Sequence, residues 1–469
     1  MEKVFWPTSI FLSLILTGCV SIDAVSPEQP NVSNAFVDES QVKAGQALVP
    51  SDVHWWSLFN DPVLDQWMAV ALSQNYSLKA AAARLEQSEA SLRSARADYV
   101  PNINASLGKE RNWIGDDPSV TTSNWTAGVS TQYELDLWGS VAALSQQQAL
   151  LAEASASSVR TVANTVAGEV TTAWLGIRNQ QQVLSLLYMQ QERLDEALKV
   201  ARARYQRGSI LLSDVLQQER LLQSISVDIY AAEAQRDVYL QQLAVWTGEG
   251  SVRITPEQLE NLPSLSPFTE PMGQVALQAL QTRPDVITAY YQVQAANAGV
   301  AAAISQRYPR FTLSASYSGE DQDINNVFDN WFASLAGALV MPIIDGGQRR
   351  ANVSRQQAVE SEAIANYQQT LLNAAQEVQN ALIRERQYQI TLDNLGEQLV
   401  LARKSLKLQN LYYSSGRLDF LFLLDAQRQL LALENQYLSA LWSQTQARIQ
   451  VYKAVSHGQF NLSEGESAS

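Results

Sequence analysis

The feature that most limits how this chain can fold is an internal repeat. Residues 208 positions apart match without gaps: Pro101 with Pro309, Gly139 with Gly347, Tyr205 with Tyr413, Gly208 with Gly416, and Arg220 with Arg428. Agreement at one spacing over so long a stretch is not expected by chance. The chain is therefore two copies of one plan. Repeat 1 covers residues 61–250, repeat 2 covers 271–458, and a Pro-rich linker, 251–270, joins them.

Each repeat carries the same predicted order of elements. A helix comes first, and in repeat 1 it is predicted to begin at Asp61-Pro62, because Asp suits the N-cap and Pro the first helical position. This helix is predicted to end near Tyr99 in repeat 1 and near Arg307 in repeat 2, just before a proline. Two strands, a very long helix, a break at a glycine and a returning helix follow. In the linker, Thr255-Pro256-Glu257-Gln258 predicts one short capped helix.

The long helices have the pattern of a coiled coil. In repeat 2 one seam position recurs every seven residues, at Ile364, Leu371, Val378, Glu385, Leu392, Leu399 and Leu406. The other is filled by Tyr367, Ala374, Ala381, Tyr388, Leu395 and Ala402. This period predicts supercoiled helices, interrupted once by the charge of Glu385. The matching helix of repeat 1, about residues 140–204, would be roughly 100 Å long. Long coiled coils often serve as rods or spacers, so periodicity alone leaves a purely structural role open.

Four segments, about 100–112, 122–138, 309–320 and 330–345, are predicted to be strands because apolar and polar residues alternate along them. In the third, Phe311, Leu313, Ala315 and Tyr317 share one face, and Thr312, Ser314, Ser316 and Ser318 share the other. Polar loops, 116–119 and 320–323, connect the strands in pairs. Such alternation with aromatic residues towards the ends is typical of membrane β-barrel strands. Two hairpins on a soluble sheet would show a similar pattern.

Four strands cannot close a barrel, and an open sheet edge is excluded in lipid. Single-chain barrels need at least about 8 strands. The strands must therefore be shared between copies of the chain. Two copies would give about 8 strands and a lumen filled by side chains, whereas three copies would give about 12 strands around an open lumen. The long helices would continue below the barrel as a hollow cylinder, and the assembly would form a conduit across the periplasm.

The N-terminus is predicted to be a lipoprotein signal. Phe5–Leu16 is short and mostly apolar, which suits a secretory signal and not a transmembrane helix. Residues 1–18 are assigned to the signal peptide, because Leu16-Thr17-Gly18-Cys19 resembles the bacterial lipobox. That resemblance implies cleavage before Cys19, a covalent lipid on it and, since Val20 follows, sorting to the outer membrane. A lone structural thiol is the alternative. Residues 19–60 would be a lipidated extension, and 459–469 a C-terminal tail.

Composition excludes several classes of function. A formal net charge of −14 argues against nucleic acid as a partner, because phosphate binding needs a basic patch. Two His, His54 and His457, and one Cys provide no His/Cys metal cluster within one subunit. No Ser/His/Asp, Cys/His or phosphate-loop pattern is present, so the chain is not predicted to be an enzyme. The only expected prosthetic group is the lipid on Cys19. Beyond the signal no run of about 18 apolar residues occurs, so any membrane crossing would use strands.

Short motifs match a known family in order along nearly the whole mature sequence. They are Trp55-Trp56-Ser57-Leu58-Phe59 with Asp61-Pro62, Tyr133-Glu134-Leu135-Asp136-Leu137-Trp138-Gly139, Arg283-Pro284-Asp285, Tyr308-Pro309-Arg310-Phe311, Pro342-Ile343-Ile344-Asp345-Gly346-Gly347 and Leu424-Asp425-Ala426-Gln427-Arg428. Each is weak alone, but together, on a tandem repeat and behind a lipobox, they are specific. The chain resembles the outer-membrane efflux proteins of the TolC/OprM type, and most closely their lipid-anchored, NodT-like branch.

The resemblance implies a fold, a location and partners. The fold is mainly α with a transmembrane β part: a coiled-coil helical tunnel and four strands per chain, which complete a 12-stranded barrel in a homotrimer. The protein would be lipid-anchored in the outer membrane and extend into the periplasm. There it would dock to a periplasmic adaptor that couples it to an inner-membrane pump, often proton-driven. The expected function is the outer-membrane channel of a tripartite efflux system, which passes small molecules such as drugs or toxic compounds to the exterior.

In this family the periplasmic end of the tunnel is closed at rest by the helix after the second glycine turn. Carried over to this sequence, the resemblance places Leu421 and Asp425 at the constriction, four residues apart on one helix face. Arg428, three residues further, would hold the closed end through ion pairs. In repeat 1 the pattern departs, because Gln217 stands at the position of Asp425. The nearest acidic residue there, Asp214, is expected to pair across helices.

The same resemblance assigns Gly208 and Gly416 to the tips of two helical hairpins that meet the adaptor. Glycine suits a tight turn between helices because it adopts positive φ freely. A turn glycine with no contact role is the alternative at each tip. For Asp425, the alternative is an ordinary exposed carboxylate in the first turns of a helix.

Three other readings of the whole chain remain open at this point. An enzyme is disfavoured by the missing motifs. A periplasmic adaptor lipoprotein would have one hairpin in mid-chain flanked by Gly-rich β domains, whereas this chain repeats the whole helix–strand–strand–helix plan. An outer-membrane duct of an ATP-driven protein or peptide secretion system would share the same fold. Five Met residues without clustering give no support for copper or silver as cargo.

Overall fold

The computed structural model describes residues 54–113, 121–252, 254–268, 275 and 277–456. The predicted signal peptide 1–18, the lipid site Cys19 and the tail 459–469 lie outside these residues. The chain divides into two compact units, which are described separately. The unit that carries the strands, here the sheet unit, includes residues 83–157 and 287–370. The hairpin unit includes the described parts of 54–82, 158–286 and 371–456.

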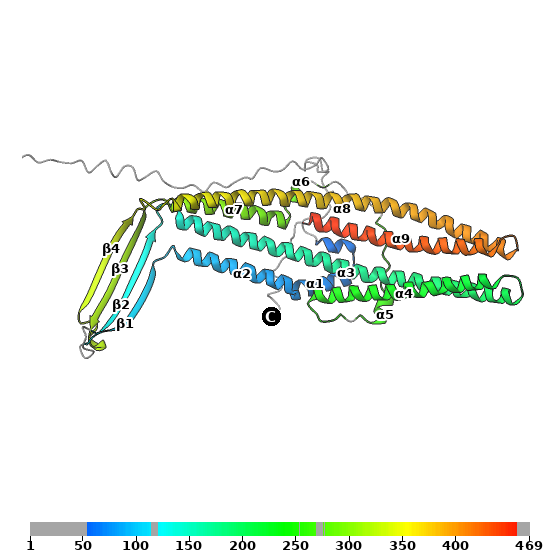
Figure 1. Ribbon diagram of the computed structural model, residues 1–469, viewed down its shortest axis with the longest axis horizontal. Coiled ribbons are helices and arrows are strands. Elements are labelled where there is room, and N and C mark those ends of the chain that lie inside the picture. Colours follow the sequence, from blue (N-terminus) through cyan, green and yellow to red (C-terminus); the bar gives the residue numbers. More distant parts are fainter. Residues whose placement is uncertain (1–53, 114–120, 253, 269–274, 276, 457–469) are drawn as a thin grey trace, which may run out of the picture. The chain divides into compact units, whose positions relative to one another are not determined.

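The elements repeat as the sequence predicts (Figure 1). In chain order they are η2 Trp55–Phe59, α1 Pro62–Gln74, α2 Tyr76–Ala97, β1 Asn102–Trp113, β2 Thr121–Leu135, α3 Ser140–Gln206, α4 Leu212–Thr247, α5 Pro256–Glu260, α6 Leu277–Gln281, α7 Pro284–Ser305, β3 Arg310–Asp321, η3 Ile324–Asn326, β4 Trp331–Val340, α8 Gln348–Ser414 and α9 Phe420–Val455. The pairs α3/α8 and α4/α9 have 67 and 36 residues each and begin 208 residues apart, so the internal repeat is confirmed.

The predicted first helix of repeat 1 differs from the structure for a local reason. The first helix of repeat 1 is not continuous, because Asn75 has an extended backbone and separates α1 from α2. Its side-chain oxygen accepts hydrogen bonds from the N–H groups of Ser77 (2.8 Å) and Leu78 (3.1 Å) and so caps α2. The linker helix α5 has the capping box expected from Thr255 and Gln258.

The strands β2 and β4 end at residues 135 and 340, before the predicted 138 and 345. The residues that follow turn the chain into α3 and α8. Asp136 accepts hydrogen bonds from the N–H groups of Val141 and Ala142, and Asp345 accepts from Gly347 and Arg349. These N–H groups of Arg349 and Gly347 hold the pKa of Asp345 below its usual range.

The sheet unit contains a four-stranded antiparallel sheet in the order β1-β2-β3-β4. The two hairpins pair through β2 and β3, where Val129 lies opposite Tyr317 and Leu135 opposite Phe311. Beneath this pairing, the indole N–H of Trp138 donates to the carbonyl of Pro309 at 2.6 Å, and its ring stacks on Tyr308. The outer edges of β1 and β4 have no strand partner among the described residues. Both edges are therefore available for pairing.

Coiled-coil packing in the hairpin unit follows the predicted seam. Leu371, Val378 and Leu392 of α8 are buried. The seam residue that broke the apolar pattern, Glu385, is only 2 % exposed and forms an ion pair with Arg448 of α9. The guanidinium of Arg448 also lies 4.6 Å from the ring centre of Phe268 in the linker. A charge in the seam is tolerated because a partner and an aromatic face replace water. None of the described helices is both long and apolar enough to cross a membrane.

A glycine allows close approach of α3 to a ring of α4 in the hairpin unit. A Cβ placed on Gly176 would lie 2.7 Å from ring carbons of Tyr239. The same ring makes an edge contact with Trp442 of α9, at 5.9 Å between centroids. Burial raises the pKa of the Tyr239 hydroxyl. The ring therefore has little room to move.

We expect Gly176→Ala to lower the free energy of unfolding by about 1–2 kcal/mol, since overpacking outweighs the gain in helix propensity. The measurement is the thermal midpoint of helical circular dichroism in detergent. Gly396→Ala is the matched control, because its Cβ would meet only Tyr437, at 4.0 Å. An equal effect of the two substitutions would show that the ring yields.

Candidate functional site

The two helical hairpins end in turns of identical geometry. At the first, the N–H of Gly208 donates to the carbonyl of Tyr205 (2.8 Å) and Ser209 to Arg204 (2.9 Å). At the second, Gly416 donates to Tyr413 (3.1 Å) and Arg417 to Tyr412 (2.9 Å). This is the Schellman arrangement, which needs a left-handed residue after the helix. Gly208 and Gly416 have φ of 70° and 73°, so the predicted positive φ is confirmed; contact with an adaptor stays a prediction.

An aspartate caps the helix that leaves each turn. Asp214 accepts a hydrogen bond from the N–H of Leu211 at 3.1 Å, at the start of α4. Asp419 accepts from the N–H of Leu421 at 2.9 Å, at the start of α9. Both carboxylates also lie at the positive end of a helix dipole. The pairing of Asp214 across helices that the sequence suggested is therefore a second role, and it stays a prediction.

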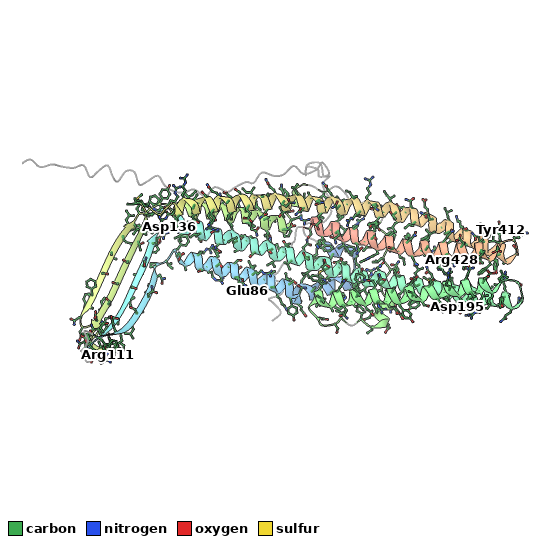
Figure 2. All side chains as sticks on the ribbon, viewed as in Figure 1. Glu86, Arg111, Asp136, Asp195, Tyr412 and Arg428 are labelled. Carbon is green, nitrogen blue, oxygen red and sulfur yellow. The ribbon has the colours of Figure 1, made fainter. Side chains whose placement is uncertain are left out.

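The three predicted gate residues of repeat 2 lie in the first turns of α9. Leu421 and Asp425 are exposed and one helical turn apart. The Asp425 carboxylate accepts a hydrogen bond from the side-chain amide of Gln429 at 2.7 Å. Arg428, labelled in Figure 2, is half-buried. It makes no ion pair with any residue that the structure describes. The exposed carboxylate and leucine are thus free to meet groups outside this chain.

Exposed apolar side chains gather around both turns. Leu211, Leu212 and Leu216 surround the first. Leu421 and Phe422 lie just after the second. Loops are usually polar, and exposed apolar groups that cluster indicate an interaction surface. The hairpin ends therefore combine apolar contact area with the aspartates that cap α4 and α9.

One contact near the ends joins the two hairpins. The guanidinium of Arg204, in the last turn of α3, lies 4.3 Å from the ring centre of Tyr413 in α8. The same ring touches Phe420 of α9, with centroids 5.7 Å apart. Cation–π contacts at exposed sites contribute about 0.5–1 kcal/mol. The ends are thus fastened weakly to each other.

A stronger junction lies further along the hairpins, at Glu434 of α9. Its side chain is 5 % exposed and receives hydrogen bonds from two residues of α3, Gln190 at 3.0 Å and Arg193 at 2.7 Å. Arg403 of α8 lies 3.5 Å from its other oxygen. We call these four residues the Glu434 junction. It connects α3 of the first hairpin to both helices of the second.

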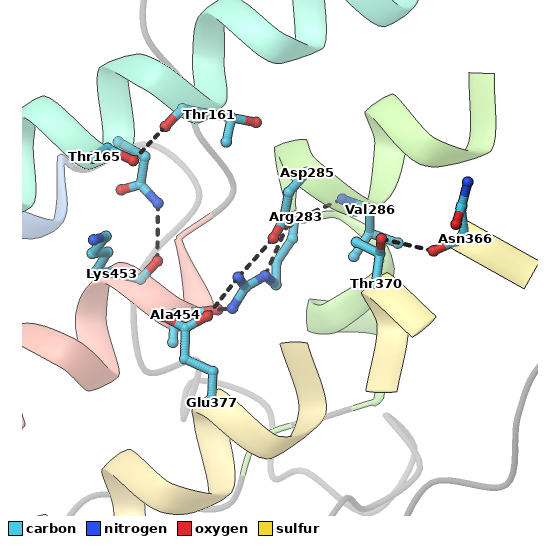
Figure 3. Close-up of polar contacts among 11 residues, drawn as sticks. Thr161, Thr165, Arg283, Asp285, Val286, Asn366, Thr370, Glu377, Lys453 and Ala454 are labelled. Carbon is cyan, nitrogen blue, oxygen red and sulfur yellow. Dashed lines mark hydrogen bonds and ion pairs between the residues drawn. The ribbon is translucent and has the colours of Figure 1, made fainter. Parts of the chain in front are cut away.

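A buried cation, Arg283, contacts the C-terminal end of α9. Arg283, just before α7, binds Asp285 at 2.9 Å and Glu377 of α8 at 2.8 Å (Figure 3). Burial lowers the pKa of Arg283, but the two carboxylates outweigh this effect and raise it. Its guanidinium also donates to the carbonyl of Ala454 at 2.8 Å. In repeat 1 the matching residue, Asn75, donates to the matching carbonyl of Trp246, also at 2.8 Å. One capping contact is thus made by different side chains in the two repeats.

The glycine turns at the hairpin ends and the gate residues at the start of α9 were predicted from the sequence. The Glu434 junction was not. No local sequence pattern connects its four members, which are Gln190, Arg193, Arg403 and Glu434. Arg283 belonged to a recognised motif without an assigned role. The one local signal was Glu385, a charge in an apolar seam. Within the described residues, no cluster of three His, Cys, Asp or Glu side chains is placed to hold a metal ion.

Comparison with protein families gives one match. The sequence model of the family described as "Outer membrane efflux protein" matches residues 67–249 and 275–457. The two matched segments are themselves displaced by 208 residues, the period of the internal repeat.

Similar proteins cover nearly the whole chain. The solvent efflux pump outer membrane protein SrpC of Pseudomonas putida is 27 % identical over 96 % of this chain and 97 % of its own length. The pyoverdine export outer membrane protein OpmQ of Pseudomonas aeruginosa is 27 % identical over 95 % of this chain and 96 % of its own. Among solved structures, the Campylobacter jejuni CmeC outer membrane channel has a TM-score of 0.80 at 20 % identity, covering 94 % of this chain and 96 % of CmeC. The open state of the Neisseria gonorrhoeae MtrE outer membrane channel also has a TM-score of 0.80, at 23 % identity over 93 % and 98 % of the two chains.

The Glu434 junction gives a test of how the hairpins are held together. We expect Glu434→Gln to lower the free energy of unfolding by about 1–3 kcal/mol, because two arginines lose their buried counter-charge but remain partly hydrated. Urea unfolding followed by circular dichroism measures the change. Glu397→Gln on the exposed face of α8 is the control and should be neutral. Equal midpoints for both variants would contradict a stabilising junction.

Proposed function

Because the chain belongs to the outer membrane efflux protein family, we propose that it is the outer-membrane channel of a tripartite efflux system and passes small toxic compounds from the periplasm to the exterior. The observation that carries this proposal is the combination of two features in one chain. The family model matches both repeats, and each repeat contributes two strands and one long helical hairpin. Relatives named for solvent efflux and for pyoverdine export support small molecules as cargo.

The sheet supports a trimeric barrel. Each chain offers one four-stranded sheet with the outer edges of β1 and β4 unpaired among the described residues. Pairing β4 of one subunit with β1 of the next would satisfy these edges, as lipid requires. Three copies give about 12 strands and an open lumen, whereas two give about 8 and a filled one. A channel therefore favours the homotrimer.

The residues at the hairpin ends support the proposal of an adaptor-docking surface and a gate. In the proposed trimer, three copies of Leu421 and Asp425 would converge at the periplasmic end, with Arg428 and Asp214 holding the closed arrangement. The turns at Gly208 and Gly416, with their exposed leucines and Phe422, would meet a periplasmic adaptor that links the channel to an inner-membrane pump, most simply a proton-driven one. A lipid on Cys19 would add an anchor in the outer membrane, where one acyl chain alone would bind weakly.

The proposed gate can be tested by removing the Asp425 carboxylate, which would bind a cation at the constriction. We expect Asp425→Ala to make the resting channel leakier, because a cation held by three carboxylates no longer blocks the constriction. Conductance in planar bilayers and cell sensitivity to vancomycin measure the leak. Asp393→Ala, an exposed aspartate on α8 far from the turn, is the control. Unchanged conductance and sensitivity in Asp425→Ala would remove Asp425 from the gate.

The efflux role is tested by identifying partners. We expect in-cell crosslinking of the mature protein to recover a periplasmic adaptor together with a proton-driven pump, since the hairpin ends offer contact area for an adaptor. Mass spectrometry of the purified complexes gives the identities. Recovery of an ATP-driven exporter would keep the channel but move its cargo towards secreted proteins or peptides. Recovery of no envelope partner would contradict a tripartite system.

A further inference from the structure

The segment that leaves β4 exposes apolar side chains to an unusual degree. β4 ends at Val340, and α8 begins at Gln348. Between them, Ile343 is 87 % exposed and Ile344 is 93 % exposed. All ten residues of β4 are exposed as well, so the apolar surface continues from the strand into the turn. Two adjacent isoleucines this exposed indicate a surface that meets something apolar.

Four arginines lie at this same end of the β3–β4 hairpin. Arg310 begins β3 and pairs in register with Val340, the last residue of β4. Arg307 precedes it, and Arg349 and Arg350 lie in the first turn of α8. The nearby carboxylates are partly engaged: Asp345 caps α8 and is 3.7 Å from Arg349, and Glu134 is 4.0 Å from Arg310. Arg350 is exposed and has no ion-pair partner among the described residues.

The charge distribution along the hairpin is strongly one-sided. Between residues 311 and 348 the sequence contains no Lys or Arg. Four acidic residues lie towards the loop end of the hairpin: Glu320, Asp321, Asp323 and Asp329. The strands thus separate a basic end, next to the helices, from an acidic end at the loop. On the β1–β2 hairpin, Figure 2 labels Asp136 next to the helices and Arg111 towards the loop, so this polarity belongs to the β3–β4 hairpin alone.

The internal repeat shows that the fold does not require these arginines. Positions 349 and 350 correspond to Val141 and Ala142 of repeat 1, and positions 307 and 310 correspond to Tyr99 and Asn102. The same strand-to-helix turn forms in both repeats without a cation in the first. Moreover, Arg349 and Arg350 stand at the positive end of the α8 dipole, where a cation is unfavourable. For Arg350, which has no ion-pair partner among the described residues, the contacts within the chain offer no explanation.

We propose that this end of the β3–β4 hairpin binds the headgroups of anionic phospholipids, with Arg349 and Arg350 as the phosphate-binding groups and Ile343 and Ile344 inserted among the acyl chains. The proposal rests on the proposed function in one respect, since the sheet must lie in the membrane. Arginine forms two parallel hydrogen bonds to a phosphate. Basic residues that flank a membrane-crossing segment are attracted to anionic lipid. The acidic loop end would be repelled by the same headgroups, so the two ends together orient the hairpin.

The test uses full-length protein in nanodiscs that contain equal amounts of phosphatidylglycerol and phosphatidylcholine. After extraction in mild detergent, native mass spectrometry counts the lipids of each kind that stay bound. We expect wild type to retain phosphatidylglycerol preferentially. Since each arginine near a membrane surface contributes about a fivefold preference, Arg349→Gln/Arg350→Gln should lower the ratio about 25-fold. Arg349→Lys/Arg350→Lys, which keeps the charge but not the paired hydrogen bonds, should retain an intermediate ratio.

Arg384→Gln/Arg386→Gln is the matched control, because it removes two arginines from the same helix but far from the strands. It should leave the ratio unchanged. An unchanged ratio in Arg349→Gln/Arg350→Gln, or no preference in wild type that has inserted, would overturn the lipid site alone and leave the channel standing. Loss of subunit association without a change in lipid ratio would also overturn it, because the arginines would then pair with a neighbouring copy. Failure of wild type to insert would overturn the proposed function and this inference together.

Discussion

An edge strand presents a row of backbone N–H and C=O groups, and in lipid each of these groups costs several kcal/mol when it has no partner. β1 and β4 are such edges in the described sheet. Because the described residues of each repeat form only two strands, these four strands cannot satisfy both edges by themselves. In the proposed trimer the pairing would come from other copies, and the helices that continue each strand pair would be arranged around the same axis. The proposed oligomer is thus the arrangement that would allow the described sheet to lie in a membrane.

The two repeats share their backbone plan but not their charges. Glu385 and Arg448 form a buried pair in repeat 2, whereas the matching positions are Ile177 and Leu240. Glu434 corresponds to Ser226. A helical hairpin therefore packs with or without these groups, and an apolar pair is often as stable as a buried ion pair. The ion pairs add directional contacts that an apolar seam lacks, and they do so in the hairpin that carries the predicted gate.

Much of the fold could be predicted from the sequence because its signals are local or periodic. The seam from Leu371 to Leu399 fixes a coiled coil, and Gly416 marks its turn through positive φ. The alternation of apolar and polar residues in β3 predicts a strand with one apolar and one polar face. The break at Asn75 escaped prediction, because the residues on both sides of it favour helix and only the side-chain cap decides. The Glu434 junction escaped for a different reason: Gln190, Arg193 and Arg403 are brought together by tertiary packing alone.

The position of that junction limits where the second hairpin can move. Between Glu434 and the turn at Gly416, the described polar contacts from α3 to α8 or α9 reduce to Arg204 against Tyr413. Apolar contacts continue for part of this distance, since Leu431 belongs to the same buried cluster as Leu194. Separating these contacts of Arg204 and Leu431 costs less free energy than exposing the buried carboxylate of Glu434, which two arginines contact. Any outward movement of Leu421 and Asp425 is therefore expected to bend the hairpin on the turn side of Glu434, while the junction and the Arg283 contacts keep the rest of α9 in place.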